Sequence, residues 1–292
     1  FQSRVWFAWF FSNSNALLAE SRLTLGDGSN VPHLTRIDLK TGRRAEGRHL
    51  SNKPADEEFV IALSDGILLD KHMDWKSIER CSIALVEFPT LREFFRVPFV
   101  ADPNKPQNAS LANYRSNISN DRNIISYYYG KTLVCRRTRD LRVLWTLEIE
   151  SPLRAFEIES PNQNYLAVAI ADNAFREQQK KSVVAIYNGM IGTEIARFPI
   201  CATDGFALSP DGSLLAVIEI TNNRKRKMYF TRINVHDMKS GDIIASVEHD
   251  RIKWQRAATI KAGCRVYFTA DGQYIISSGM NTKIWSLDKN QG

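Results

Sequence analysis

Short apolar runs separated by polar turns recur along the whole chain. Each repeated unit is an apolar strand, a polar turn, and a second strand that opens on two apolar residues. The clearest copies span residues 205–216 and 266–276, and the others span 9–18, 59–69, 155–166 and, more loosely, 114–125. The first apolar residue after the turn recurs every 41 to 60 residues. Because Asp-Gly and Asn-rich turns between apolar runs are typical of tight hairpins, the pattern predicts repeated β-hairpins.

A second hairpin is predicted in every unit. Third strands are expected at 34–39, 82–88, 132–137, 182–187, 232–238 and 283–287. Glycine-containing turns at 40–42, 190–192 and 239–241 follow three of these strands. Fourth strands are expected at 93–99, 143–149, 194–200 and 243–249, where apolar and polar residues alternate over part of each run. The repeated unit therefore consists of four antiparallel strands.

This repetition predicts an all-β fold, a β-propeller of about six four-stranded antiparallel blades in a single domain over residues 1–292. The blades are expected at 6–50, 57–99, 111–150, 153–200, 204–249 and 257–292. One such sheet cannot bury both of its faces, whereas a ring of sheets can. A two-sheet sandwich is the alternative, but it does not require a repeated unit of this length. The best helical candidate, 173–181, is too short to change the class.

The two ends of the chain bear on closure of the ring. The sixth unit ends after its third strand, so residues 1–5 are expected to supply the missing edge of the last blade. The chain begins with Phe1 rather than Met, and a seventh blade, a signal segment or a fused domain upstream stays open. Because no run approaches the roughly 18 apolar residues of a membrane span, a soluble protein is expected. The sequence does not identify its compartment.

Three segments resemble a known superfamily. Ser-Pro-Asp-Gly-Ser-Leu-Leu-Ala at 209–216, Lys-Ile-Trp-Ser-Leu-Asp at 283–288 and Arg-Ile-Asn-Val-His-Asp-Met-Lys-Ser-Gly at 232–241 are similar to repeats of the WD-repeat, YVTN and TolB-like propellers. The resemblance implies a fold and hardly any function, because these motifs are structural. The chain departs from regular WD repeats, since no Gly-His pair opens a repeat and no Trp-Asp pair closes one. The regular hydrogen-bonded tetrad of those repeats is therefore not expected.

Motifs for chemistry are mostly missing from the sequence. It contains no nucleophile elbow, zinc-protease helix or glycine-rich phosphate loop. The histidines share no metal-ligand spacing, and three of them, His33, His72 and His249, fall in predicted loops or strand ends where a solvated side chain is expected. The four cysteines form no Cys-x-x-Cys pair, so buried free thiols are expected, with a disulfide between distant positions left open: Cys81, Cys135, Cys201 and Cys264. We expect no cofactor and no metal.

An enzyme is the alternative. Propeller lactonases, which are similar in fold, hold a metal in the central channel with carboxylates and amides from several blades. Glu57, Glu58, Asn113 and Asp204 lie near the starts of predicted inner strands and are the candidates for such a site. A propeller-type dehydrogenase subunit is the other enzymatic reading. Because such residues also cap strands in any propeller, a module without catalysis is favoured.

Long connections predict a binding face. Those between second and third strands, at 25–33, 70–80, 172–181 and 221–229, share one end of the blades with the inter-blade segments at 99–110 and 249–263. Residues 221–229 carry a formal +4, residues 250–261 carry +3 and residues 175–181 carry +2, against +7 for the whole chain. The basic excess is therefore local. The candidate binding residues are Arg224, Lys225, Arg226, Lys227, Lys253, Trp254, Arg256, Lys180 and Lys181.

The partner predicted from this charge is an acidic protein or peptide, bound with salt-sensitive affinity. Nucleic acid is disfavoured, because a single basic run lacks the interleaved aromatic residues that usually stack on bases. A solvated hairpin tip that only aids solubility is the alternative for these charges. A monomer is favoured.

Overall fold

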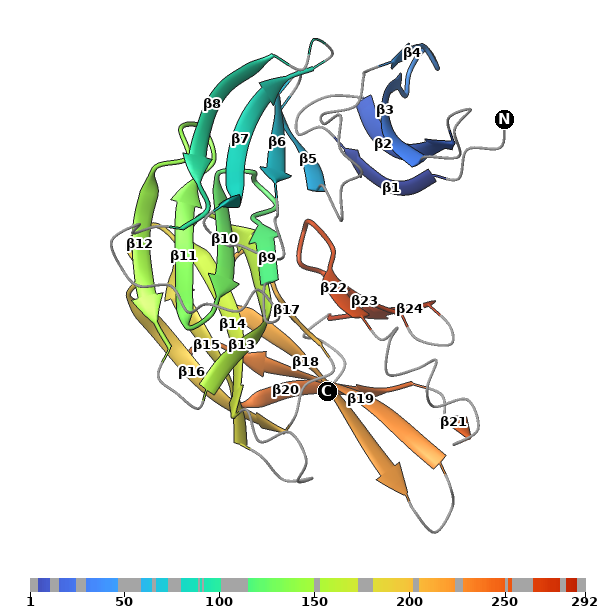
Figure 1. The fold of residues 1–292 in the computed structure, drawn as a ribbon. Helices are drawn as coiled ribbons and strands as arrows, with labels where there is room; N and C mark the ends of the chain where they lie inside the picture. The colour runs from blue at the N-terminus through green and yellow to red at the C-terminus, as the bar shows by residue number, and fades with distance from the viewer. Residues whose placement is uncertain are drawn as a thin grey trace. The chain divides into compact units, whose positions relative to one another are not determined.

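The computed structural model consists of β-strands. It describes residues 5–10, 16–24, 30–46, 59–64, 67–72, 80–88, 90, 92–100, 115–149, 153–172, 181–201, 205–223, 228–249, 252–253, 265–278 and 282–287. The described residues form six antiparallel sheets and no α-helix (Figure 1). They group into two compact units: unit 1 comprises Phe1–Ala112 and Arg136–Val143, and unit 2 comprises Asn113–Cys135 and Leu144–Gly292.

Unit 1 holds two four-stranded sheets. The first contains β1 (Val5–Phe10), β2 (Ala16–Thr24), β3 (Asn30–Asp38) and β4 (Arg44–Glu46) in that order. The second contains β5 (Phe59–Ser64), β6 (Ile67–His72), β7 (Ser82–Glu87) and β8 (Glu93–Pro98). A third sheet has residues in both units and contains β9 (Arg115–Ile118), β10 (Ile124–Tyr129), β11 (Thr132–Arg137) and β12 (Val143–Glu148).

Unit 2 holds the remaining sheets. The fourth contains β13 (Leu153–Asn162), β14 (Tyr165–Asp172), β15 (Lys181–Asn188) and β16 (Glu194–Cys201). The fifth contains β17 (Phe206–Leu208), β18 (Leu214–Asn223), β19 (Met228–Asp237) and β20 (Ile243–Glu248), with β21 (Ile252–Lys253) added to β19. The sixth contains β22 (Arg265–Phe268), β23 (Tyr274–Ser278) and β24 (Thr282–Ser286).

The unit of four antiparallel strands is confirmed. β11 has the predicted bounds, and β10, β14, β18 and β23 each begin at the predicted apolar residue after the turn. Of the helical candidate, residues 173–180 lie outside the described residues and Lys181 begins β15. The exact blade bounds and the single domain over residues 1–292 stay predictions.

Apolar side chains fill the spaces between neighbouring sheets of unit 2. β18 shows how: Leu215 and Val217 pack with residues of the fourth sheet, whereas Ala216 and Ile218 pack with residues of the sixth. Alternate residues of a strand lie on opposite faces, so a strand between two sheets must be apolar at every position. The unbroken apolar run 214–218 therefore reflects burial on both faces. In unit 1 a comparable cluster joins the first and second sheets through Leu18, Leu34 and Leu68.

The turns between first and second strands share one geometry in three sheets of unit 2. In the fifth sheet the Asp211 carboxylate accepts the Ser213 N–H at 3.0 Å, and Gly212 has a φ of 73°. In the sixth sheet the Asp271 carboxylate accepts the Gln273 N–H at 3.0 Å. Hydrogen bonds from the Thr269 hydroxyl and that N–H hold the pKa of Asp271 below its ordinary value. The predicted Asp-Gly turns at 211–212 and 271–272 are confirmed, whereas the one at 65–66 lies outside the described residues.

The third sheet makes the same turn without glycine. Arg122 has a φ of 62° and donates its N–H to the Ser119 carbonyl at 2.8 Å, as Gly212 does to Ser209 at 2.9 Å. Asp121 accepts the N–H of Asn123 at 3.2 Å. This substitution is why residues 114–125 match the sequence repeat only loosely, although their backbone repeats it.

These turns are also bonded from one sheet to the next. The Asp121 carboxylate accepts the Gln163 N–H of the fourth sheet at 2.9 Å, and the Asn162 carboxamide donates to the Pro210 carbonyl of the fifth at 2.6 Å. The third and fourth sheets are also joined through Trp145 on β12, which donates its indole N–H to the Gly189 carbonyl, after β15, at 2.8 Å. Polar turn residues therefore set how neighbouring sheets of unit 2 are aligned.

A buried arginine links two sheets within unit 1. Arg136, 4% exposed, donates to the Leu141 carbonyl at 2.7 Å and to the Pro98 carbonyl, at the end of β8, at 3.0 Å. Its guanidinium thus satisfies carbonyls on two sheets, which is how a buried charge is tolerated. Sequence reasoning did not find this residue, because nothing in the pattern separates it from the exposed arginines.

Two glycines in the same turn type offer a matched test of turn strain. Gly272 has a φ of 71°, and an added Cβ would meet only Pro210 Cδ at 3.7 Å. At Gly212 an added Cβ would lie 2.4 Å from the Tyr165 ring. We expect Gly272→Ala to cost about 1–3 kcal/mol from backbone strain alone, and Gly212→Ala to cost clearly more. Denaturant titration checks this, and Tyr165→Ala should relieve part of the Gly212→Ala cost. Equal costs for the two glycine variants would contradict the packing argument.

The sixth sheet has three strands among the described residues, and the sequence predicts that the N-terminal segment supplies its fourth strand. Val5 pairs with Ser21 inside β1, so residues 1–4, which lie outside the described residues, are the part of the predicted closing segment that stays available. If they add to β24, deleting them should lower the melting temperature by at least about 2–4 °C, the shift expected for 1 kcal/mol in a protein of this size. Deleting residues 288–292 is the control. An unchanged melting temperature after the first deletion would refute closure by this segment.

Candidate functional site

The longest hairpin of unit 2 ends in the basic run. β18 and β19 pair over ten residues each, from Leu214 with Asp237 to Asn223 with Met228. β17 pairs only with residues 215–217 of β18, and β20 pairs only with residues 232–236 of β19. The distal half of the hairpin therefore extends past the body of its sheet. Arg224, Lys225, Arg226 and Lys227 connect its strands and lie outside the described residues.

This hairpin corrects the prediction of a loop over 221–229. Residues 221–223 and 228–230 are strand, as are residues 30–33 of the loop predicted at 25–33. The polar run Thr221-Asn222-Asn223 has no apolar alternation that would predict a strand. Backbone pairing with residues 228–230 forms the strand there.

A short strand brings a second predicted basic residue to the hairpin. β21 pairs antiparallel with β19, so that Lys253 lies opposite Met228 and Ile252 opposite Tyr229. Lys253 is therefore next to the backbone that continues into Lys227. These two positions are 26 residues apart in the sequence, and only the strand pairing joins them.

Of the remaining predicted binding residues, Lys181 is among the described residues. Lys181 is the first residue of β15 and pairs with Cys201. Because β15 and β19 are the third strands of neighbouring sheets, Lys181 begins its strand at the same end as the β18–β19 hairpin. Lys180, Trp254 and Arg256 lie outside the described residues.

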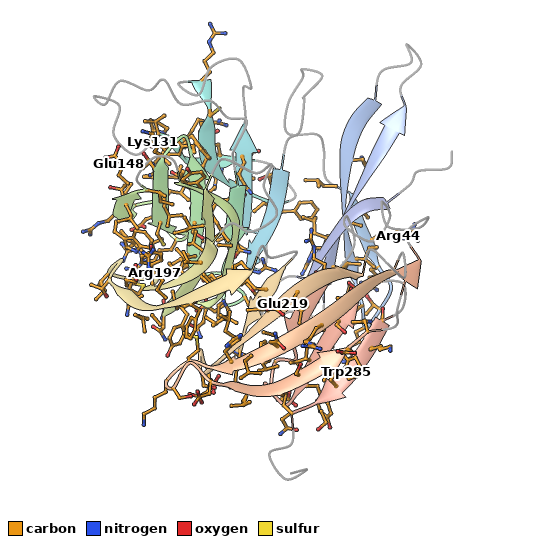
Figure 2. All side chains as sticks on the ribbon, turned by 90° about the horizontal axis from the view of Figure 1, so that it is seen from below. Arg44, Lys131, Glu148, Arg197, Glu219 and Trp285 are labelled. Carbon is orange, nitrogen blue, oxygen red and sulfur yellow. The ribbon has the colours of Figure 1, made fainter. Side chains whose placement is uncertain are left out.

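Charges at the base of the hairpin are balanced. Arg232 on β19 donates to the Glu248 carboxylate of β20 at 2.6 Å, and both side chains are about half exposed. This hydrogen bond raises the pKa of Arg232 above its ordinary value. Glu219 lies on β18 nearby in the same sheet (Figure 2). The base therefore adds little positive charge to that of the four-residue tip.

A cavity of about 310 Å³ lies among the innermost strands of unit 2. We call it the inner-strand cavity. Its walls come from β9, β13, β17 and β22, from the turns that follow β9 and β17, and from Gly205 before β17. Polar residues on its wall are Asn117, Asn120, Glu159, Ser160 and Arg265, and three aromatic residues also line it: Phe206, Tyr267 and Phe268. None of these was singled out from the sequence, because inner-strand positions differ from repeat to repeat.

The residues considered for a channel metal are not described: Glu57, Glu58, Asn113 and Asp204. Among the residues that the structure describes, no group of three or more His, Cys, Asp or Glu side chains could hold a metal ion. Cys81 and Cys135 are buried free thiols, as expected, and burial raises the pKa of Cys135 to about 12. No helix among the described residues is long and apolar enough to cross a membrane.

His249 corrects the expectation of a solvated side chain. Its Nε2 is hydrogen-bonded to the Ser277 hydroxyl on β23, and its ring meets the Trp285 ring edge-on with centroids 5.9 Å apart. Trp285 on β24, marked in Figure 2, donates its indole N–H to the same hydroxyl at 2.8 Å. His33 likewise belongs to β3, where it pairs with Ser21, and not to a loop.

Comparison with known proteins identifies the fold. No family model matches the chain, and no curated protein matches it. The Dos1 propeller is 12% identical with a TM-score of 0.55, covering 97% of this chain and 70% of its own. The β-propeller domain of Cps50 (Swd1) from Myceliophteria thermophila is 10% identical with a TM-score of 0.55, covering 98% and 99%. KlHsv2 with its loop 6CD replaced by a Gly-Ser linker is 10% identical with a TM-score of 0.53, covering 99% and 95%.

The chain therefore has the fold of a β-propeller. The hydrogen-bonded set of His249, Ser277 and Trp285 joins the residue after β20 to the second and third strands of the sixth sheet, a polar link that the sequence did not predict. At these identities the likeness concerns the fold alone.

Two buried serines on second strands provide a matched test of that set. Ser277 is 1% exposed and bonds both His249 and Trp285, whereas the hydroxyl of Ser126, 0% exposed, has no hydrogen-bond partner among the described residues. Ser277→Ala should cost about 1–3 kcal/mol, because the indole N–H loses its acceptor, and Ser126→Ala should be neutral or slightly stabilising. Denaturant titration of both variants measures these changes in the free energy of unfolding. Equal effects would mean that the three-residue set contributes nothing.

Proposed function

We propose that this protein is a non-catalytic propeller scaffold that binds an acidic protein or peptide segment at the end of unit 2 that carries the β18–β19 hairpin. The observation that carries the proposal is the pairing of β21 with β19. It sets Lys253 beside the hairpin whose connection is Arg224-Lys225-Arg226-Lys227.

Protrusion of the hairpin favours binding by its tip. Its distal half has few strand partners among the described residues, so little of it is needed to complete the fifth sheet. Binding residues are often found on connections held by a rigid scaffold. The fifth sheet supplies that scaffold, since both its faces are packed against neighbouring sheets.

Electrostatics favour an acidic partner. Four successive basic residues with no acid create a positive potential that reaches on the order of 10 Å at moderate salt. Such a patch raises association rates with acidic partners, and added salt weakens it. An extended acidic segment that follows the tip would run toward Lys253 on β21, and Lys181 begins β15 at the same end of the neighbouring sheet. Aromatic residues for base stacking are not interleaved with this run, which disfavours nucleic acid.

The test replaces all four tip residues with alanine and measures binding of a fluorescent poly-glutamate peptide across a salt series. At low ionic strength the affinity should fall by at least about tenfold, which corresponds to 1.4 kcal/mol. Retention on heparin should fall as well. The salt dependence of peptide binding should become shallower, because fewer charge contacts remain.

A matched control removes the same charge elsewhere. The control uses four exposed residues in or beside turns between third and fourth strands: Lys40, Arg43, Arg44 and Lys239. In each sheet this turn lies at the opposite end of the third strand from the connection between second and third strands. Replacing these four should leave peptide binding within about twofold. Equal losses in both variants would show a non-specific response to net charge, and tighter binding of duplex DNA or RNA than of the peptide would replace the acidic partner with nucleic acid.

A further inference from the structure

We propose that the inner-strand cavity is a binding site for a small neutral polyhydroxyl ligand, a sugar or a cyclic polyol. The cavity lies entirely within unit 2, and its volume of about 310 Å³ is at the lower end of the roughly 300–1,000 Å³ range of small-molecule sites. It is independent of the basic tip, since Asn120 and Pro210 on its wall belong to turns at the opposite end of the strands from the β18–β19 hairpin.

Asn117, one of the residues that line the cavity, carries an unpaired acceptor. The carboxamide oxygen of Asn117 is buried and has no hydrogen-bond partner among the described residues. Buried acceptors without a donor are rare in native proteins, because their desolvation costs free energy that no hydrogen bond offsets. A ligand hydroxyl in the cavity would supply the missing donor.

Comparison with the equivalent pair of the fifth sheet shows that the fold does not require this polarity. Asn117 pairs with Ser126 on β10, and Glu159 pairs with Ala167 on β14. The corresponding pair in the fifth sheet is Ala207 with Ala216, which packs in an apolar cluster. A small apolar residue is therefore sufficient for packing at this position. The amide and the carboxylate in the third and fourth sheets are not needed for packing.

The mixture of donors and acceptors selects the ligand class. Glu159 and Arg265 are the charged residues among the described lining, and their formal charges cancel. An anion or a cation would therefore gain attraction from one of them and repulsion from the other. Carboxamides, a carboxylate and a guanidinium together offer both donors and acceptors, which is what hydroxyl groups require since each can donate and accept.

Aromatic residues on the cavity wall also suit a sugar or a cyclic polyol. Phe206, Tyr267 and Phe268 line the same cavity as the polar groups. A sugar or cyclic polyol presents C–H groups as well as hydroxyls, so it can contact aromatic and polar walls together. Tyr267 is 53% exposed and is therefore accessible to a ligand from solvent.

The test uses the full chain and saturation-transfer NMR with D-glucose, D-galactose and myo-inositol as neutral probes. Arginine amide and succinate serve as charged probes of similar size. We expect binding of at least one neutral probe, weakened at least about tenfold by Asn117→Ala and by Tyr267→Ala. Tyr274→Ala is the matched control, because Tyr274 is also exposed, at 39%, and does not line the cavity.

A stability measurement keeps the result interpretable. Asn117→Leu removes the unpaired acceptor, so it should unfold at the same or a higher denaturant concentration while abolishing binding. Binding of a charged probe alone, binding of none of the five probes, or neutral-probe binding unchanged in Asn117→Ala would each overturn the proposal.

Discussion

Burial of both faces of each inner sheet is the constraint on which the structure of unit 2 depends. A four-stranded sheet of this size exposes apolar side chains on two sides, and each side is covered only when another sheet packs on it. β14 and β18 show the consequence, because their alternate residues belong to different clusters and their sequences are apolar at consecutive positions. Removing one sheet would expose the faces of its neighbours.

Polar contacts then align the sheets that the apolar clusters hold together. Apolar contacts are not directional, whereas the hydrogen bonds from Gln163 to Asp121 and from Asn162 to Pro210 form only when particular turns meet. The same reasoning applies to Arg136 in unit 1 and to the set of His249, Ser277 and Trp285 in unit 2. Each lies where a strand of one sheet ends against another, and each satisfies polar groups that packing would otherwise bury unpaired.

Both proposed sites use positions that this arrangement leaves free. The distal half of the hairpin of β18 and β19 extends beyond the residues that pair with β17 and β20. The inner-strand cavity lies among the first strands of four sheets, and its wall carries polar side chains at a position that is alanine in the fifth sheet. The first site is suited to charge attraction over a distance, and the second to direct hydrogen bonds with a small molecule.

The sequence by itself determined the repeated four-stranded unit, since apolar alternation and Asp-Gly turns are local signals with a direct backbone cause. β11 and the glycine turn at Gly272 were predicted as they are found. It also located the basic run, because charge needs no structure to be counted. Tertiary structure alone decided the pairing of Lys253 with Met228, the buried contacts of Arg136 and His249, and the gathering of Asn117, Glu159 and Arg265 around one cavity. These depend on which residues meet across sheets, and residues far apart in the sequence carry no local pattern that records their meeting.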